Sequence, residues 1–306
     1  MKKVGFIYDD IFLLHEMPVG HPESKERLIA INNILKQSDI RDRLIHIKPR
    51  KAETNDILSV HTNSYIEKVL KFTGYYDSDT YISQNSVEAA LYAAGAVIEA
   101  IEACKTGTIQ RAFCAVRPPG HHAEAGSAMG FCIFNNVAVG ARYAQKAGYQ
   151  KVFIIDFDVH HGNGTQHIFE SDDTVFYFST HQYPHYPGTG SDLERGKGKG
   201  AGTTYNIPMQ HGSGDKDYFH AYQDILPGLV SKFAPDIVLV SAGYDLHAGD
   251  PLAGIRVTNE GIRDIVRGIL SSKKDIPYIF CLEGGYNLDT LSGSVLITLE
   301  ELLCFE

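Results

Sequence analysis

The chain has 306 residues, of which 43% are hydrophobic and 21% charged, a composition typical of a folded globular protein that can bury a full core. Its 28 lysines and arginines against 37 acidic residues give a formal net charge of −9. Because the basic residues form no local cluster, this balance argues against direct binding to nucleic acid or to an anionic membrane surface.

Predicted strands and helices alternate along the chain. In chain order they are a strand at 4–8, a helix at 22–37 that opens on Pro22, a strand at 44–47, a long Ala-rich helix capped by Ser86, a strand at 112–116, a helix at 136–146, strands at 152–157, 175–178 and 237–240, a helix at 258–270, a strand at 278–282 and a helix at 291–302. The strands lack polar alternation, which indicates that helices cover both faces of their sheet. The sequence therefore predicts one α/β domain over residues 1–306, a three-layer αβα arrangement with a mainly parallel sheet.

The cysteines and the first residues of the chain favour a reducing compartment. The five cysteines are Cys104, Cys114, Cys132, Cys281 and Cys304. They are odd in number, contain no Cys-x-x-Cys pair and lie mostly in apolar runs, which is typical of buried, reduced thiols. Asp9 and Asp10 interrupt the N-terminal apolar stretch too early for a signal peptide, and no segment approaches about 18 consecutive apolar residues. We expect a cytoplasmic protein without a membrane span, and the sequence leaves open whether it forms a homo-oligomer.

Polar motifs directly follow four of the predicted strands. They are Arg117-Pro-Pro-Gly-His121-His122, Asp158-Val-His160-His161-Gly-Asn163-Gly, Ser241-Ala-Gly-Tyr-Asp245 and Glu283-Gly-Gly-Tyr286. Because the carboxyl ends of parallel strands meet at one edge of a sheet, we expect these side chains to gather there.

Three of these residues form a candidate metal site. Asp158 and His160 are two positions apart, so in an extended segment they project to the same side, and Asp245 can supply a third ligand. One nitrogen and two oxygen ligands leave a position open for water, as a catalytic zinc site requires. The alternative, that Asp158 and His160 only cap a turn, does not account for the other motifs.

The motif set resembles one known family. Besides the four strand-end motifs it contains His21-Pro22-Glu23, Gly130-Phe131-Cys132, Asp156-Phe-Asp-Val-His-His-Gly-Asn-Gly-Thr-Gln166 and Gly249-Asp-Pro251. Together these motifs resemble the zinc-dependent histone deacetylase family, which includes acetoin-utilization proteins and acetylpolyamine amidohydrolases, and in particular its class II branch with bacterial relatives. The resemblance implies the arginase/deacetylase fold and hydrolysis of the amide of a linear acylated amine.

The resemblance also implies cofactors and catalytic residues. Asp158, His160 and Asp245 would bind one catalytic zinc ion, and Asp156 and Ser179 would supply side-chain ligands to a structural potassium ion. His121 and His122 match the family's tandem histidines, one of which takes a proton from water and returns it to the amine. Tyr286 matches the hydroxyl group that stabilises the oxyanion.

Substrate contacts follow from the same resemblance. Phe131, beside Gly130, and Tyr186 match the walls of a tunnel for the acyl chain. Asp79 matches a rim residue that holds a substrate backbone, and Arg27 an arginine near an internal acetate channel. Leu252 stands where a polyamine-selective relative has a glutamate, which argues mildly against polyamines. The expected partner is an acetylated peptide or a small acetylated amine.

Two positions depart from the pattern of some relatives. Asn163 replaces an aspartate behind the second histidine, so we expect the pKa values of His121 and His122 to differ and predict His122 as the general base. Tyr186 replaces a common phenylalanine, and its hydroxyl either binds a polar substrate group or has no such role.

The other histidines carry weaker expectations. His161 adjoins a ligand and is expected to orient its loop. His61, His211 and His220 are expected at the surface, and His15 and His21 are candidates for the rim.

Three other functions are compatible with parts of the sequence. Arginase-like enzymes need second acids at the positions that Gly162 and His247 occupy, so a two-manganese site is disfavoured. The glycine-rich stretch 188–202 lacks the spacing of a phosphate-binding loop. An inactive acetyl-binding module stays open as an alternative, although Tyr286 is present.

Overall fold

One parallel sheet of eight strands forms the centre of the computed structural model, which describes residues 2–305. The strands are β1 (Val4–Ile7), β2 (Ile45–Ile47), β5 (Arg111–Cys114), β6 (Val152–Asp156), β7 (Val175–Gln182), β8 (Thr204–Met209), β9 (Ile237–Ala242) and β10 (Tyr278–Leu282). Their order across the sheet is β2-β1-β5-β10-β9-β6-β7-β8. A separate short antiparallel pair joins β3 (Gly74–Tyr75) and β4 (Tyr81–Ile82).

All seven predicted strands are present, and the apolar strands of the sheet's interior are buried along their whole length. The prediction that both faces are covered is wrong for β2, an edge strand whose residues are only partly buried. The opposite edge strand, β8, was missed because its polar residues and Pro208 break the apolar pattern, which an edge strand tolerates.

Helices connect the strands. They are α1 (Glu26–Gln37), α2 (Thr54–Leu58), α3 (Asn63–Val69), α4 (Ser86–Lys105), α5 (Asn136–Ala147), α6 (Asn163–Phe169), α7 (Asp215–Phe219), α8 (Leu226–Phe233), α9 (Asn259–Ser271) and α10 (Leu288–Cys304). Single turns lie at Asp10–Leu14, Arg41–Arg43 and Gly198–Gly200, and a π-helical segment at His220–Ile225 joins α7 to α8. Helix ends follow local chemistry: Thr258 accepts a hydrogen bond from the Gly261 backbone to cap α9, and Gly148 ends α5 at a φ of 110°.

Three predicted helix starts are wrong, and that of α10 lies at Leu288 and not at Leu291. Helix α1 begins at Glu26 and not at Pro22, because the preceding residues turn the Glu23 side chain inward, where it is fully buried against Arg117. Ser86 is the first residue of α4 and not its cap; its hydroxyl accepts a hydrogen bond from the Ser83 backbone. The starts of α1 and α4 both lie beside contacts with distant residues, of Glu23 with Arg117 and of Ser86 with His15.

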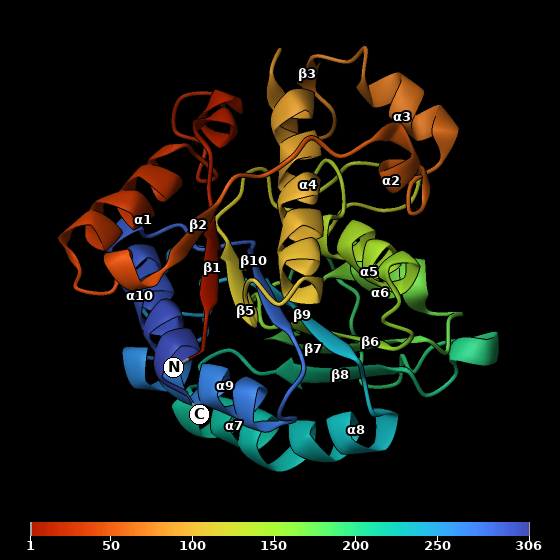
Figure 1. The fold of residues 1–306 in the computed structure, drawn as a ribbon. Helices are drawn as coiled ribbons and strands as arrows, with labels where there is room; N and C mark the ends of the chain where they lie inside the picture. The colour runs from red at the N-terminus through yellow and green to blue at the C-terminus, as the bar shows by residue number, and fades with distance from the viewer. Residues whose placement is uncertain (1, 306) are drawn as a thin grey trace.

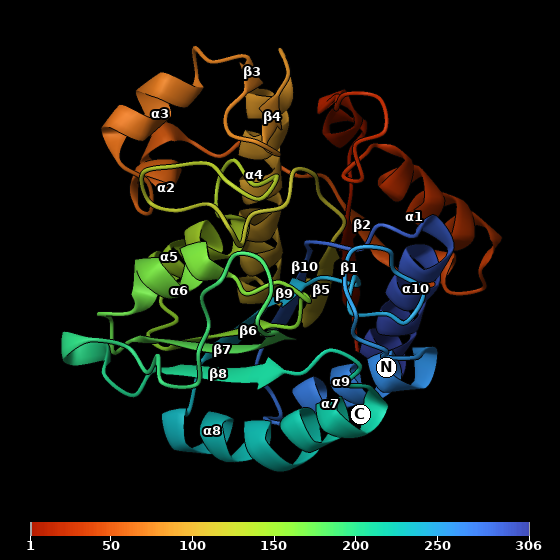
Figure 2. The ribbon, with the colours of Figure 1, turned by 180° about the vertical axis from the view of Figure 1, so that it is seen from behind.

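The helices form two layers around the sheet. Figures 1 and 2 show α4, α5 and α6 on one side, and α1, α7, α8, α9 and α10 on the other. Contacts between α4 and α5, and between α10 and both α1 and α9, support these two groups. The fold is the predicted three-layer α/β domain (Figure 1).

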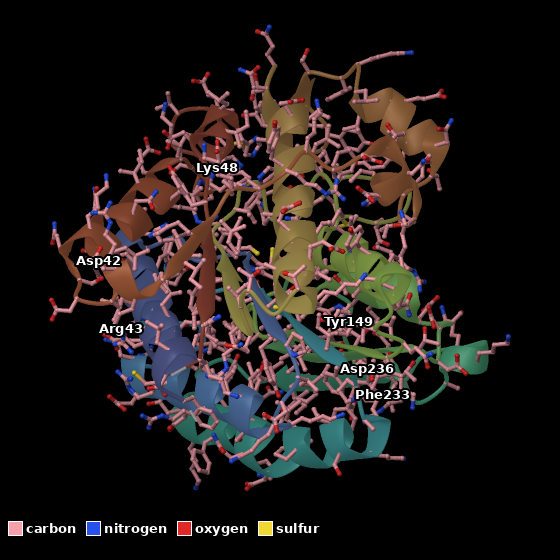
Figure 3. The ribbon with its side chains drawn as sticks, viewed as in Figure 1. Asp42, Arg43, Lys48, Tyr149, Phe233 and Asp236 are labelled. Carbon is pink, nitrogen blue, oxygen red and sulfur yellow. The ribbon has the colours of Figure 1, made fainter. Side chains whose placement is uncertain are left out.

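The two ends of the strands differ in chemistry. At the amino end, the Lys151 backbone donates to the Asp236 carboxylate at 2.8 Å and so ties the start of β6 to that of β9. Figure 3 labels Phe233 and Asp236 at this end. At the carboxyl end, the strands β5, β10, β9 and β6 are consecutive neighbours in the sheet, so their following loops converge.

Candidate active site

The four strand-end loops meet around one small cavity of about 100 Å³. It is lined by Asp79, Pro119, His121, His122, Gly130, Phe131, His160, Tyr186, Leu252, Gly284 and Tyr286. These residues come from chain positions more than 200 apart, yet nearly all were singled out by motif. The parallel topology brings them together as expected.

Asp158, His160 and Asp245 form a compact group of metal-ligating side chains whose ligand atoms lie within 4.8 Å of one another. His160 Nδ1 lies 3.2 Å from Asp158 Oδ1 and 3.1 Å from Asp245 Oδ2. Ligand atoms about 2.0–2.1 Å from a tetrahedral zinc ion are roughly 3.3–3.4 Å apart, so these separations fit such an ion.

Backbone groups hold the two carboxylates in place. The Gly284 N–H donates to Asp158 Oδ2 at 2.8 Å, and the Val159 N–H donates to Asp245 Oδ1 at 2.9 Å. A Cβ at Gly243 would overlap the Asp158 carboxylate, and one at Gly284 would overlap that of Asp245. Gly243 and Gly284 must therefore lack a side chain so that the Asp158 and Asp245 carboxylates can fit beside them.

The tandem histidines have different partners. His121 Nδ1 donates to the Asp156 carboxylate at 3.1 Å, whereas His122 Nδ1 donates to the amide oxygen of Asn163 at 2.7 Å. Burial lowers the pKa of His121, but the carboxylates of Asp156 and Asp158 outweigh it and raise this pKa to about 10. Burial and the nearby His121 hold the pKa of His122 well below its usual value. Burial lowers the pKa of both rings, and only His121 has an anionic hydrogen-bond partner that offsets this effect.

Tyr286, the last residue of the Glu283–Tyr286 motif, lines the cavity. Burial, followed by the Asp245 carboxylate, raises the pKa of Tyr286 well above its usual value, so the hydroxyl remains a neutral donor. The buried Arg27 donates to the Gly285 carbonyl at 2.7 Å and to the Glu283 carbonyl at 2.5 Å, and its guanidinium carbon lies 5.1 Å from the Tyr286 ring centroid. Arg27 thus fixes the turn that carries Tyr286.

Aromatic side chains form the cavity walls. The Phe131 ring packs edge-on against Tyr286, with centroids 5.9 Å apart, and Tyr186 packs edge-on against His122 at 5.2 Å. Phe131 adopts a positive φ of 68°, and a Cβ on the preceding Gly130 would overlap His122. This close approach explains why glycine precedes Phe131.

The rim carries Asp79 and His21. His21 Nε2 lies 3.0 Å from the Asp79 carbonyl, and the His21 ring packs against Phe131. Of the two histidines considered for the rim, His21 is there. His15 instead lies buried beneath it, 2.7 Å from the Ser86 hydroxyl.

Asp156 and Ser179 are paired in register on β6 and β7 and are fully buried. Ser179 Oγ lies 2.8 Å from His181 Nδ1. His161 lies outside the metal-ligating group and bonds Thr189 at 2.7 Å and Gln166 at 2.9 Å, as expected of a residue that orients its loop.

The prediction that His61 is a surface residue is wrong. His61 is buried; its Nδ1 donates to the Glu124 carbonyl at 2.9 Å, and its Nε2 accepts from the Asn135 backbone at 3.0 Å. Burial lowers the pKa of His61 to about 4. The polar neighbours of His61 in sequence concealed this burial, and only the paired backbone partners account for it.

This burial predicts a dependence of stability on pH. Below about pH 6.5 the unfolded chain binds a proton at His61, whereas the folded chain binds one there only near pH 4. The contribution of His61 to the free energy of unfolding is therefore fully present above about pH 6.5 and is lost as the pH falls toward 4. The loss attributable to His61 reaches about 3 kcal/mol near pH 4. Urea unfolding between pH 7.5 and 4.5 should show a smaller loss for His61→Asn, which keeps a donor; equal pH slopes in both proteins would contradict the assignment.

Comparison with known proteins decides the family. A family model of the histone deacetylase domain matches residues 21–302. The chain belongs to the histone deacetylase family. It is 38% identical over 293 residues to a probable deacetylase of Archaeoglobus fulgidus, covering 93% of this chain and 82% of that protein. It is 37% identical over 309 residues to the polyamine deacetylase HDAC10 of Homo sapiens, covering 95% of this chain but 46% of that protein.

The fold agrees with this family. The crystal structure of the HDA15 HD domain matches with a TM-score of 0.95 and 39% identity, covering 99% of this chain and 88% of that one. Within residues 2–305 of this histone deacetylase family member, Asp158, His160 and Asp245 are the one group of three or more such side chains with metal-ligating spacing. No helix in the same range has the length and apolarity needed to cross a bilayer.

Proposed function

We propose that the protein is a zinc-dependent amidohydrolase that removes an acetyl group from the terminal amine of a linear chain such as acetyl-lysine. The observation that carries the proposal is the meeting of three metal-ligating side chains, two differently paired histidines and a neutral tyrosine hydroxyl at one narrow cavity. Family membership supports the same reaction class.

Each residue has a role in this reaction. Zinc held by Asp158, His160 and Asp245 would acidify a water molecule and polarise the amide carbonyl. Because His122 carries its proton on Nδ1, its Nε2 is free to take the proton of water and pass it to the leaving amine. The Tyr286 hydroxyl would donate to the developing oxyanion, and His121, which donates to Asp156, packs against the His122 ring at a centroid distance of 4.0 Å.

Two further assignments belong to the same proposal. A potassium ion would be held by Asp156 and Ser179, which lie side by side on neighbouring strands. All five cysteines are unpaired, which supports the proposed cytoplasmic location because that compartment keeps thiols reduced.

A panel of acylated amines tests the proposal. We expect the zinc-loaded protein to release acetate from an acetyl-lysine amide and from N-acetyl diamines, but not from α-acetylated branched amino acids, because the cavity that Phe131 and Tyr186 line has a volume of only about 100 Å³. His122→Ala should abolish turnover with bound zinc retained. Hydrolysis of the branched substrates alone would overturn the tunnel assignment, and acetyl binding without turnover would favour the inactive binding module.

A polyamine substrate is the second candidate, favoured by the acidic rim. The Asp79 N–H donates to Asp77 Oδ1 at 3.1 Å, and burial followed by the Asp77 carboxylate raises the pKa of Asp79. Leu252, apolar at the cavity, argues in the other direction. In the same panel, Asp79→Asn should weaken turnover of a cationic N-acetyl diamine more than that of a neutral acetyl-lysine amide if polyamines are the substrate, and should affect both equally if peptides are.

A further inference from the structure

A chain of hydrogen bonds leads from the His122 ring to the protein surface. Asn163 Oδ1 lies 2.7 Å from His122 Nδ1, and Asn163 Nδ2 donates to Glu124 Oε1 at 2.5 Å. The same carboxylate oxygen accepts a hydrogen bond from His167 Nδ1 at 2.8 Å. His122 and Asn163 are buried, whereas the Glu124 side chain is 27% exposed and that of His167 is 40% exposed.

The direction in which the Asn163 amide points determines the proton position on His122. A carboxylate only accepts hydrogen bonds, so Glu124 requires the NH₂ group of Asn163 to face it. The amide oxygen must then face His122, which places the ring proton on Nδ1 and leaves the Nε2 lone pair toward the cavity. A reversed amide would donate to Nδ1 and move the ring proton to Nε2, where it blocks the acceptance of a proton from water.

The other contacts of the Asn163 NH₂ group are weak. They are the sulfur of Met129 at 3.2 Å and the His122 carbonyl at 3.4 Å. A thioether is a poor acceptor, and the carbonyl lies near the distance limit for a hydrogen bond. The Glu124 carboxylate is therefore the contact that distinguishes the two amide orientations.

The position of Glu124 does not depend on its carboxylate. Its backbone forms a turn with Ser127, with the Glu124 N–H donating to the Ser127 carbonyl at 2.9 Å. The buried His61 donates to the Glu124 carbonyl. Asn163 and His167 lie one helical turn apart on α6, so both side chains reach the Glu124 carboxylate.

We propose that Glu124 is a positioning residue that fixes the orientation of the Asn163 amide and thereby keeps His122 in the tautomer needed for a general base. The inference rests on the proposed function, because it gives His122 that role. It adds Glu124, which no motif singled out, to the residues on which the reaction depends.

Glu124→Ala is the first test. We expect kcat on the acetyl-lysine amide to fall about 10- to 100-fold, the range expected for losing a hydrogen bond to a charged group. KM, zinc content and melting temperature should stay near the wild-type values, because the turn is held by backbone contacts. His167→Ala is the matched control: it removes the other partner of the carboxylate but leaves the amide contact, so kcat should change less than about threefold.

A double variant that exchanges the donor and the acceptor at positions 124 and 163 distinguishes a positioning role of Glu124 from a purely structural one. Glu124→Lys presents a donor to Asn163 and favours the reversed amide, so its kcat should fall at least as far as that of Glu124→Ala. Adding Asn163→Asp to Glu124→Lys supplies a group that accepts from both the new ammonium and His122, and should restore kcat about tenfold or more over the single variant.

The outcomes distinguish this inference from the proposed function. If His122→Ala abolishes turnover while Glu124→Ala retains kcat within twofold, the inference fails and the function stands. If His122→Ala retains turnover, the general-base assignment itself fails. Should Glu124→Ala lower the melting temperature, the double variant decides: restored kcat supports positioning, and unrestored kcat overturns it.

Discussion

Asp158→Ala and Asp245→Ala are each expected to remove bound zinc and amide hydrolysis together. Each change deletes one of three side chains whose ligand atoms lie within 4.8 Å, and the remaining two cannot hold the ion tightly. We expect zinc near zero by metal analysis and turnover below about 1% of the wild-type rate, since the ion supplies both water activation and carbonyl polarisation.

The control for the metal-ligand variants is Asp192→Ala, which removes an exposed acid from the 188–202 loop and should retain zinc and activity. Full zinc occupancy in both ligand variants would refute the site. So would two tightly bound transition-metal ions per wild-type chain.

Tyr286→Phe is expected to lower kcat by about 10²–10³-fold with little change in KM. The hydroxyl is the only group lost, while the ring keeps its contacts with Arg27 and Phe131, so substrate binding and the turn should be preserved. The size of the effect is that of removing one oxyanion donor. Steady-state kinetics with the acetyl-lysine amide measure it, and Tyr75→Phe, on an exposed tyrosine of β3, serves as control. An unchanged kcat under conditions where chemistry is rate-limiting would exclude Tyr286 from the reaction.

Most residues that line the cavity could be predicted to lie together because they belong to local sequence patterns. Apolar runs marked β5, β6, β9 and β10, and each run ended directly in a polar motif. Once strands are parallel, their carboxyl ends must share an edge, so Asp158 and Asp245 could be brought together without knowledge of the strand order. The exact order, with β9 and β10 between β5 and β6, had no local signal.

Residues whose roles depend on distant partners escaped prediction. Glu23 is fully buried because Arg117 and Arg27 surround it, and His61 because the Glu124 and Asn135 backbones face it. A single polar residue in a sequence looks the same whether it is exposed or paired in the interior. Glu124 was missed for the same reason, since its partner Asn163 lies 39 positions away.

The strand order has a consequence for how the protein is made. Strands β9 and β10 are synthesised after β5 to β8, yet they lie between β5 and β6. A growing chain that ends before residue 237 therefore cannot close its sheet, because the centre of the sheet is still missing. Asp245 and Tyr286 both belong to this late segment, so the proposed metal site and hydroxyl donor can form only when the central gap is filled. Chains that end earlier lack one of the three proposed ligands, and on this proposal a cation would be bound only after the central strands are made.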